Sequence, residues 1–387
     1  MDGEVSGRRL RAIAPPAVAF VLAFLLLTLA LALHDRRVGD RFDLARWERD
    51  TIAAKWLYAV GAPLRDDPAA DLAIARYFAL DDRSSAEARR LEGAVEAAIA
   101  GRVDAVARAE GLDGRLPLFG SRSVFPPVSL ELAPPPEVLV VSPRDVVRRE
   151  ETRLLRPGLV TADAVALEGQ IERDARRSAL VVPSGGVATY PAVVSNRGSY
   201  RRTLATAAHE WTHHYLTFYP LGLAYYRSND AATINETVAD IVGDELAARV
   251  LDRFGDPTAG APAESPSTPG GPGAPTRDVD ATLRDLRIEV DALLAVGRIP
   301  EAEARMAAVR DELNAEGYRI RRINQAYFAW YGTYAARPDA VDPLGPALRE
   351  LRERTSSLEA FLAAIRGTNS RTGVDDALAA VEAAPAR

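Results

Sequence analysis

The sequence contains no cysteine among its 387 residues. This absence excludes disulfide bonds and every zinc site built on thiolates, so histidine and carboxylate side chains remain as metal ligands. Histidine is also rare, with four in the chain, and Lys55 is the one lysine among 48 basic residues. The formal net charge is −6 and the two signs are interspersed, so no basic patch indicates nucleic acid as a partner.

Two of the four histidines, His209 and His213, stand four residues apart in the stretch H-E-W-T-H. Leucine, alanine and aromatic residues around this stretch predict a helix, on which both imidazoles share one face and can bind one ion. Glu210 can reach a water molecule beside that ion without becoming a ligand. The structural alternative is a buried helix whose histidines bond to neighbours. His214 points about 100° away, so we expect it at the surface or behind the ligands.

A third ligand is available 23 residues after His213, at Glu236. The segment from Thr233 to Val242 predicts the start of a second helix, on which Glu236 and Asp240 face the same way. Glu236 could complete a His-His-Glu site. Asp240 could accept the free ring N–H of a ligand histidine, and Asn235 could act similarly. Thr233 and Glu236 also fit a capping box, in which Glu236 would bond to the start of the helix.

The stretches H-E-W-T-H and N-E-T-V-A-D together resemble the gluzincins, the thermolysin-like superfamily of zinc peptidases, in a membrane-anchored form. The resemblance covers residues 180–250. It implies Zn²⁺ bound by His209, His213 and Glu236, with Glu210 as the general base and Asp240 behind a ligand. No histidine follows His214, and the G-x-M-E-N stretch of one aminopeptidase branch is missing. The resemblance therefore implies peptide hydrolysis by metal-activated water and gives no support for exopeptidase activity.

An aromatic run between residues 323 and 334 carries Asn324, Tyr327, Tyr331 and Tyr334 at helical spacing. A stripe of this kind usually belongs to a hydrophobic core. Some gluzincins, however, stabilise the oxyanion with a tyrosine hydroxyl. Tyr327 is our first candidate for that catalytic role and Tyr331 the second, with Asn324 as a positioning group.

Residues 12–33 carry no charged side chain and are long enough to span a bilayer as one helix. We expect a transmembrane anchor after a short tail, residues 1–11. A cleaved signal peptide ending near Ala30-Leu31-Ala32 is the alternative. More arginines come after the run than before it, so the positive-inside rule does not support a cytoplasmic amino terminus. Because a first hydrophobic segment usually exports the chain after it, we expect a cell-membrane protein with an extracytoplasmic catalytic part.

The expected fold is α+β and mainly helical, with a small mixed sheet whose edge strand lies next to the H-E-x-x-H helix. A buried strand at 138–141 precedes expected helices near 144–155 and 162–177. Residues 180–182 and 187–195 are expected to pair, the second run as an edge strand because it contains Pro191. A peptide could add to that edge, or the proline could protect it from aggregation.

After the anchor we expect a helical membrane-proximal region at 34–120, with helices at 42–60 and 85–110, and then a catalytic core at 121–255. A disordered Pro- and Gly-rich insertion is expected at 256–278. It is followed by a helical C-terminal subdomain at 279–367, which opens with a helical hairpin, and by a flexible tail at 368–387. The sequence predicts a membrane-anchored zinc metallopeptidase that hydrolyses a peptide or protein substrate. Two alternatives stay open: a catalytically silent relative that binds peptides at the membrane, and a structural anchored helical protein. The oligomeric state is not predicted.

Overall fold

The computed structural model describes residues 40–44, 47, 68–115, 122–259, 277–335, 337, 338 and 340–383. This part of the chain is mainly helical with small sheets, which confirms the expected α+β class. The helices are α3 (Pro68–Phe78), α4 (Ala86–Ala109), α5 (Thr161–Ile171), α6 (Tyr200–Leu216), α7 (Pro220–Leu223), α8 (Asn229–Phe254), α9 (Val279–Ala295), α10 (Ile299–Ala315), α11 (Gln325–Tyr331), α12 (Leu344–Arg354), α13 (Leu358–Ile365) and α14 (Arg371–Ala383). The strands are β1 (Asp113–Arg115), β2 (Arg122–Val124), β3 (Leu130–Ala133), β4 (Glu137–Pro143), β5 (Glu151–Leu155), β6 (Arg177–Pro183), β7 (Gly186–Val187) and β8 (Ala192–Ser195).

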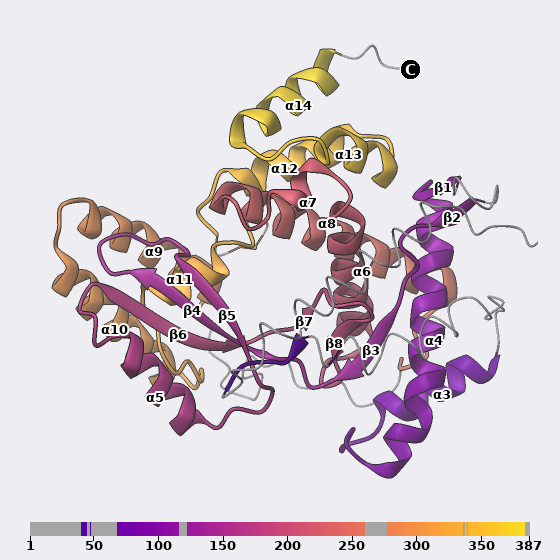
Figure 1. Ribbon diagram of the computed structural model, residues 1–387, viewed down its shortest axis with the longest axis horizontal. Helices are drawn as coiled ribbons and strands as arrows, with labels where there is room; N and C mark the ends of the chain where they lie inside the picture. Colours follow the sequence, from indigo (N-terminus) through magenta and orange to yellow (C-terminus); the bar gives the residue numbers. More distant parts are fainter. Residues whose placement is uncertain are drawn as a thin grey trace, which may run out of the picture.

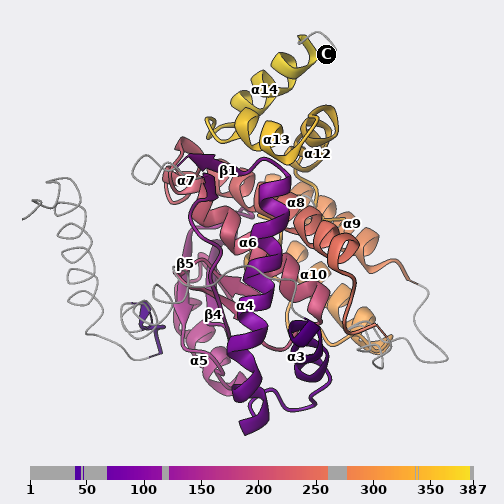
Figure 2. The ribbon, with the colours of Figure 1, turned by 90° about the vertical axis from the view of Figure 1, so that its right-hand side faces the viewer.

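The elements form two lobes (Figure 1). One lobe contains the sheet of β4, β5 and β6 with α5, α9, α10 and α11, and the other is built around α6 and α8. Figure 2 shows α4 running along the outer side of α6 and α8, which agrees with their contacts. Helices α12, α13 and α14 lie together at one end of the molecule.

Helices α6 and α8 pack against each other at unusually short range. At Gly243 of α8, an added Cβ would lie 2.8 Å from the carbonyl oxygen of Ala205 and 3.1 Å from Cβ of His209. Only a residue without a side chain fits this approach. Trp211 fixes the other side of α6, because its buried indole N–H donates to the carbonyl of Pro126 at 2.8 Å. The pair of helices therefore forms a rigid base for the side chains between them.

The sheet of the second lobe is antiparallel, in the order β5-β4-β6. Strand β4 is buried on both faces, which confirms the strand expected at 138–141. Because successive side chains of a strand point to opposite faces, Val138 and Val140 pack toward Ala326 of α11, whereas Leu139 and Val141 pack toward α5. This packing sets α11 firmly on one face of the sheet, with its aromatic side chains beside β4.

A separate mixed sheet has the order β3-β8-β7, with β3 parallel and β7 antiparallel to β8. The expected pairing of 180–182 with 187–195 is wrong, since β6 belongs to the other sheet. The expectation that 187–195 forms an edge strand is also wrong. Pro191 immediately precedes β8, so it interrupts no ladder, and β8 pairs on both sides. The edge strand next to α6 is instead β7.

Several expected helices are confirmed and two expectations for local structure are wrong. Helix α4 and the hairpin of α9 and α10 match the expected helices closely. The helix expected near 144–155 is wrong, because 151–155 form β5 and pair with β4. The flexible tail expected at 368–387 is wrong over 371–383, which form α14. Val374 of α14 is fully buried, and Arg371 pairs with Asp342 at 2.7 Å.

The expected membrane anchor at 12–33 and the tail at 1–11 lie outside the described residues, as do most of the insertion at 256–278 and most of the helix expected at 42–60. Among the described residues, no helix has both the length and the apolar character needed to cross a membrane.

Candidate metal centre

Helix α6 presents His209 and His213 on its face toward α8. The helix begins at Ser199, whose side chain accepts a hydrogen bond from the backbone N–H of Arg202, and continues without a break to Leu216. The opposite face of the helix is buried in the large hydrophobic core. That burial fixes the rotation of the helix, and with it the direction of both imidazoles.

Helix α8 brings Glu236 to the same place. The helix begins at Ser228, whose hydroxyl accepts from the N–H of Ala231 at 3.0 Å. Thr233 is therefore already inside the helix, and the alternative in which Glu236 closes a capping box is wrong. The carboxylate of Glu236 faces α6 instead, and it is buried.

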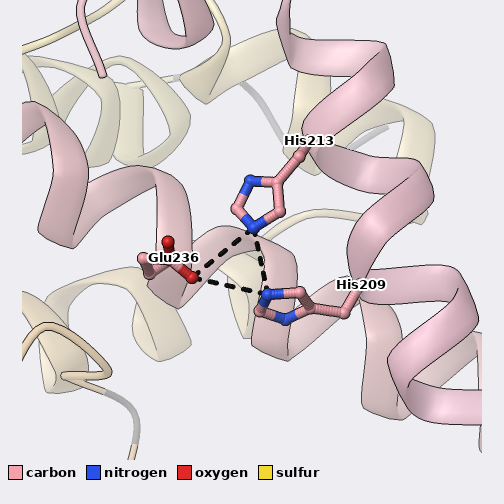
Figure 3. A group of neighbouring side chains, drawn as sticks. All are labelled: His209, His213 and Glu236. Atoms are coloured by element: carbon pink, nitrogen blue, oxygen red, sulfur yellow. Dashed lines mark hydrogen bonds and ion pairs between the residues drawn. The ribbon is translucent and has the colours of Figure 1, made fainter. Parts of the chain in front are cut away.

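The three side chains converge on one point (Figure 3). The Nε2 atoms of His209 and His213 lie 3.0 Å apart, and Oε2 of Glu236 lies 3.4 Å from the first and 3.5 Å from the second. One ligand atom from each residue lies within 4.8 Å of the other two. This buried His-His-Glu group could hold a metal ion.

The outer ring nitrogens of both histidines point at oxygen atoms. Nδ1 of His209 lies 3.0 Å from Oδ1 of Asp240, and Nδ1 of His213 lies 2.7 Å from Oδ1 of Asn235. Because these oxygens accept hydrogen bonds, each neutral imidazole carries its proton on Nδ1 and keeps a lone pair on Nε2. Two lone pairs and a carboxylate oxygen then face one another, an arrangement that could hold a metal ion.

The ionisation of the three residues shows the same demand for positive charge. Burial opposes protonation of His209, yet hydrogen bonds to Asp240 and Glu236 raise its pKa well above the ordinary value. The pKa of His213 is also raised, by Glu236 against burial. For Glu236 burial acts in the opposite direction, but the two histidines hold its pKa well below the ordinary range. The site therefore attracts protons or a metal ion.

Glu210 lies beside this group without joining it. Its carboxylate is buried against β7, where an added Cβ on Gly186 would lie 2.6 Å from Oε1 of Glu210. Burial raises the pKa of Glu210, while the nearby histidines lower it by a smaller amount. A carboxylate whose pKa is shifted toward neutrality can take up a proton and return it, as a general base must.

A cavity of about 780 Å³ opens over His209, Glu210 and His213. It lies between the two lobes, and its walls come from both. They include the edge strand and its flanks at 185–188, the segment containing Arg149 and residues 152–154, the α7 region with Tyr225 and Tyr226, and the end of α11 with Trp330, Tyr331 and Tyr334. The candidate metal centre is thus accessible to a molecule of peptide size.

Two tyrosines of this cavity approach the candidate metal ligands. The hydroxyl of Tyr225 donates to Oε1 of Glu236, and its ring centroid lies 6.0 Å from that of His213. The ring of Tyr334 lies 6.3 Å from that of His209. Burial, followed by the charge of Glu236, raises the pKa of both hydroxyls well above the ordinary value. Both tyrosines therefore remain protonated hydrogen-bond donors.

The other residues of the aromatic run are placed differently. Tyr331 lines the cavity, but Tyr327 packs between the β4 face of the sheet and the helical hairpin and is not part of the cavity wall. Asn324 caps α11: its side chain accepts from the N–H of Tyr327 and donates to the carbonyl of Ala179, both at 2.9 Å. The run contributes Trp330, Tyr331 and Tyr334 to the cavity wall. Asn324 and Tyr327 instead hold α11 in place on the sheet.

The remaining histidine of α6 is buried, so the expectation of a surface position for His214 is wrong. Its Nε2 lies 2.7 Å from the carbonyl oxygen of Thr189, and burial lowers its pKa to about 4. A neutral His214 thus ties α6 to the loop before β8.

Sequence reasoning missed Tyr225 as a contact of the candidate metal ligands. It lies in a short turn after α7, where no periodic pattern marks which side chain will face the next helix. The available sequence signal was its position between the two motifs H-E-W-T-H and N-E-T-V-A-D.

Comparisons of the chain with protein-family models, with curated proteins and with solved structures gave no match. The chemistry of this centre is therefore inferred from its own residues and geometry.

Proposed function

We propose that this chain is a zinc metallopeptidase of gluzincin type, anchored to the membrane by residues 12–33 with its catalytic part outside the cytoplasm. The proposal depends above all on one observation: the Nε2 atoms of His209 and His213 and a carboxylate oxygen of Glu236 converge beside the carboxylate of Glu210. A ligand group and a separate base are the two parts that hydrolysis by activated water needs.

The donor set favours zinc over the hard cations. Calcium and magnesium take oxygen ligands almost entirely, whereas zinc binds imidazole nitrogen and carboxylate oxygen in tetrahedral geometry. Bond lengths of about 2.0–2.1 Å place tetrahedral ligand atoms roughly 3.3 Å apart. The distances of 3.0, 3.4 and 3.5 Å between the three atoms are close to that value. Three protein ligands also leave the fourth position that catalytic zinc sites keep open.

The reaction divides among the side chains of the cavity. Zinc in this position supplies Lewis acidity, which polarises a carbonyl and lowers the pKa of water. Glu210 takes a proton from the water molecule as the water oxygen attacks the scissile carbonyl carbon. Glu210 then gives that proton to the amine nitrogen as the C–N bond breaks. Tyr334 is our candidate donor to the oxyanion. It takes the place of Tyr327, which is not part of the cavity wall. We prefer it to Tyr225 because the hydroxyl of Tyr225 already donates to Glu236.

A peptide could be held at the edge of the mixed sheet. Strand β7 pairs with β8 on one side, and among the described residues no strand pairs with its other side. The backbone of β7 lines the cavity next to Glu210. An extended substrate that adds to β7 would place its main chain in front of the base.

The proposal is tested with the Glu210→Gln variant. Because Glu210 is not a ligand, we expect this variant to keep its zinc and to lose hydrolysis of a peptide library by at least about 10³-fold. A Glu289→Gln variant on the exposed face of α9 is the matched control and should behave like the unaltered protein. Zinc bound to the unaltered protein without any peptide hydrolysis would contradict the proposal and favour the peptide-binding alternative.

A further inference from the structure

Arg149 occupies a distinctive position in the cavity wall. It lies between β4 and β5, on the lobe opposite the helices that carry the metal ligands. Its guanidinium carbon lies 5.5 Å from the ring centroid of Tyr225. Because Tyr225 also donates to Glu236, its side chain lies between the guanidinium of Arg149 and a proposed metal ligand. Arg149 also forms a side-chain hydrogen bond with Tyr225. Because a guanidinium carries five N–H groups, others remain for a ligand.

The other arginines that line the cavity contact different groups. Arg153 pairs with Glu151 at 2.6 Å. The guanidinium of Arg337 lies 5.3 Å from the ring centroid of Tyr331. Burial raises the pKa of Asp244, and the positive charge of Arg202 is among the causes that lower it. Among the residues that the structure describes, no carboxylate forms an ion pair with Arg149.

Arg149 is half-buried, so its charge is only partly solvated. The acid nearest to it through Tyr225 is Glu236, whose oxygens are already used by the two histidines and by the tyrosine hydroxyl. A planar guanidinium that lacks a protein counter-ion and faces a cavity is suited to bind a carboxylate through two parallel hydrogen bonds.

We propose that Arg149 binds a carboxylate of the substrate, so that the cavity selects peptides with an acidic group close to the scissile bond. The inference rests on the proposed function in one respect, namely that the substrate occupies this cavity. The carboxylate can belong to an aspartate or glutamate side chain or to a free C-terminus, and both sources present the same planar group to Arg149.

The test measures binding apart from turnover. The Glu210→Gln variant of the full chain is titrated by calorimetry with peptides that differ only in Glu against Gln, and with one peptide ending in a free carboxylate against its amide. We expect at least one carboxylate member to bind about tenfold or more tightly than its neutral partner, a difference of roughly 1.4 kcal/mol. The pair that shows the difference identifies the source of the carboxylate.

Substitution of Arg149 decides whether this side chain is responsible. In the Arg149→Gln variant we expect the affinity ratio between carboxylate and neutral peptides to fall to about one, and Arg149→Lys should retain part of it. Arg153→Gln is the matched control and should retain the full ratio. Zinc content and the melting temperature of each variant show that the site and the fold persist.

The outcomes separate this inference from the proposed function. Equal affinity for both members of every pair, or a ratio that persists in Arg149→Gln, would overturn the carboxylate site even if the unaltered protein hydrolyses peptides. A ratio that depends on Arg149 in a protein without peptidase activity would support the carboxylate site and contradict the proposed hydrolysis.

Discussion

Nδ1 of His209 lies 3.0 Å from Oδ1 of Asp240, one helical turn beyond Glu236 on α8. In the neutral imidazole this contact places the proton of His209 on Nδ1, and it directs Nε2 toward His213 and Glu236. A single helix thus provides both a candidate metal ligand and the group that orients another candidate ligand. Glu236 and Asp240, four residues apart on α8, contact the two ring nitrogens of His209 on α6.

The contact predicts a specific effect on metal binding. Replacing Asp240 with Ala should weaken zinc binding by about 10- to 100-fold, because His209 loses the acceptor that orients its ring. Competition with a chromophoric chelator measures this change. Asp244→Ala removes a carboxylate one turn further along the same cavity wall and serves as the control. Equal affinities for the two variants would show that the contact does not position His209.

The two tyrosines near the ligands should differ in their effects. Tyr334→Phe should lower kcat by roughly 10²-fold and leave the zinc content unchanged, since an oxyanion donor acts in the transition state. Tyr225→Phe should instead weaken zinc binding, because it removes the donor to Oε1 of Glu236. Steady-state kinetics and metal analysis of both variants separate these roles. Normal kcat in Tyr334→Phe would remove that residue from the mechanism.

Stability should depend on pH in opposite ways with and without metal. The raised pKa values of His209 and His213 stabilise the metal-free fold below about pH 6.5, and this stabilisation is lost as the pH rises through the folded-state values. The lowered pKa of Glu236 contributes above about pH 4.3 and is lost only as the pH falls through its folded-state value. Zinc competes with the protons of the histidines, so its binding strengthens as the pH rises.

Melting temperatures with zinc and with a chelator, measured between about pH 6 and pH 9, check this expectation. The increase in melting temperature on addition of zinc should grow with pH. An increase that stays constant or shrinks across this range would mean that the histidines do not exchange protons for metal.

The group of residues at the centre could be predicted from the sequence because helical spacing determines it. His209 and His213 share a face on any α-helix, and so do Glu236 and Asp240. The contact between the two helices depends on Gly243, whose missing side chain permits the approach to His209. A glycine within a helical pattern does not by itself indicate which helix it will contact.

Elements whose identity depends on their partners were harder to predict. The charged residues of the segment 151–155 are compatible with either a helix or a strand. The segment forms a strand because it pairs with the edge of β4. The place of helix α14 depends on the burial of Val374 in the large core and on the pairing of Arg371 with Asp342. Ala377, Leu378 and Val381 pack against the same core. Tyr327 and Tyr334 lie seven residues apart in one aromatic run, and only the packing of α11 on the sheet decides which one reaches the cavity.

The central claim is that His209, His213 and Glu236 bind zinc together. Metal content by mass spectrometry, on the unaltered protein and on His213→Ala and Glu236→Ala variants purified without chelators, tests it most directly. We expect about one zinc per chain in the unaltered protein and in the Glu289→Gln control, and loss of that zinc in both ligand variants. Zinc retained by Glu236→Ala, or no zinc in the unaltered protein, would contradict the account.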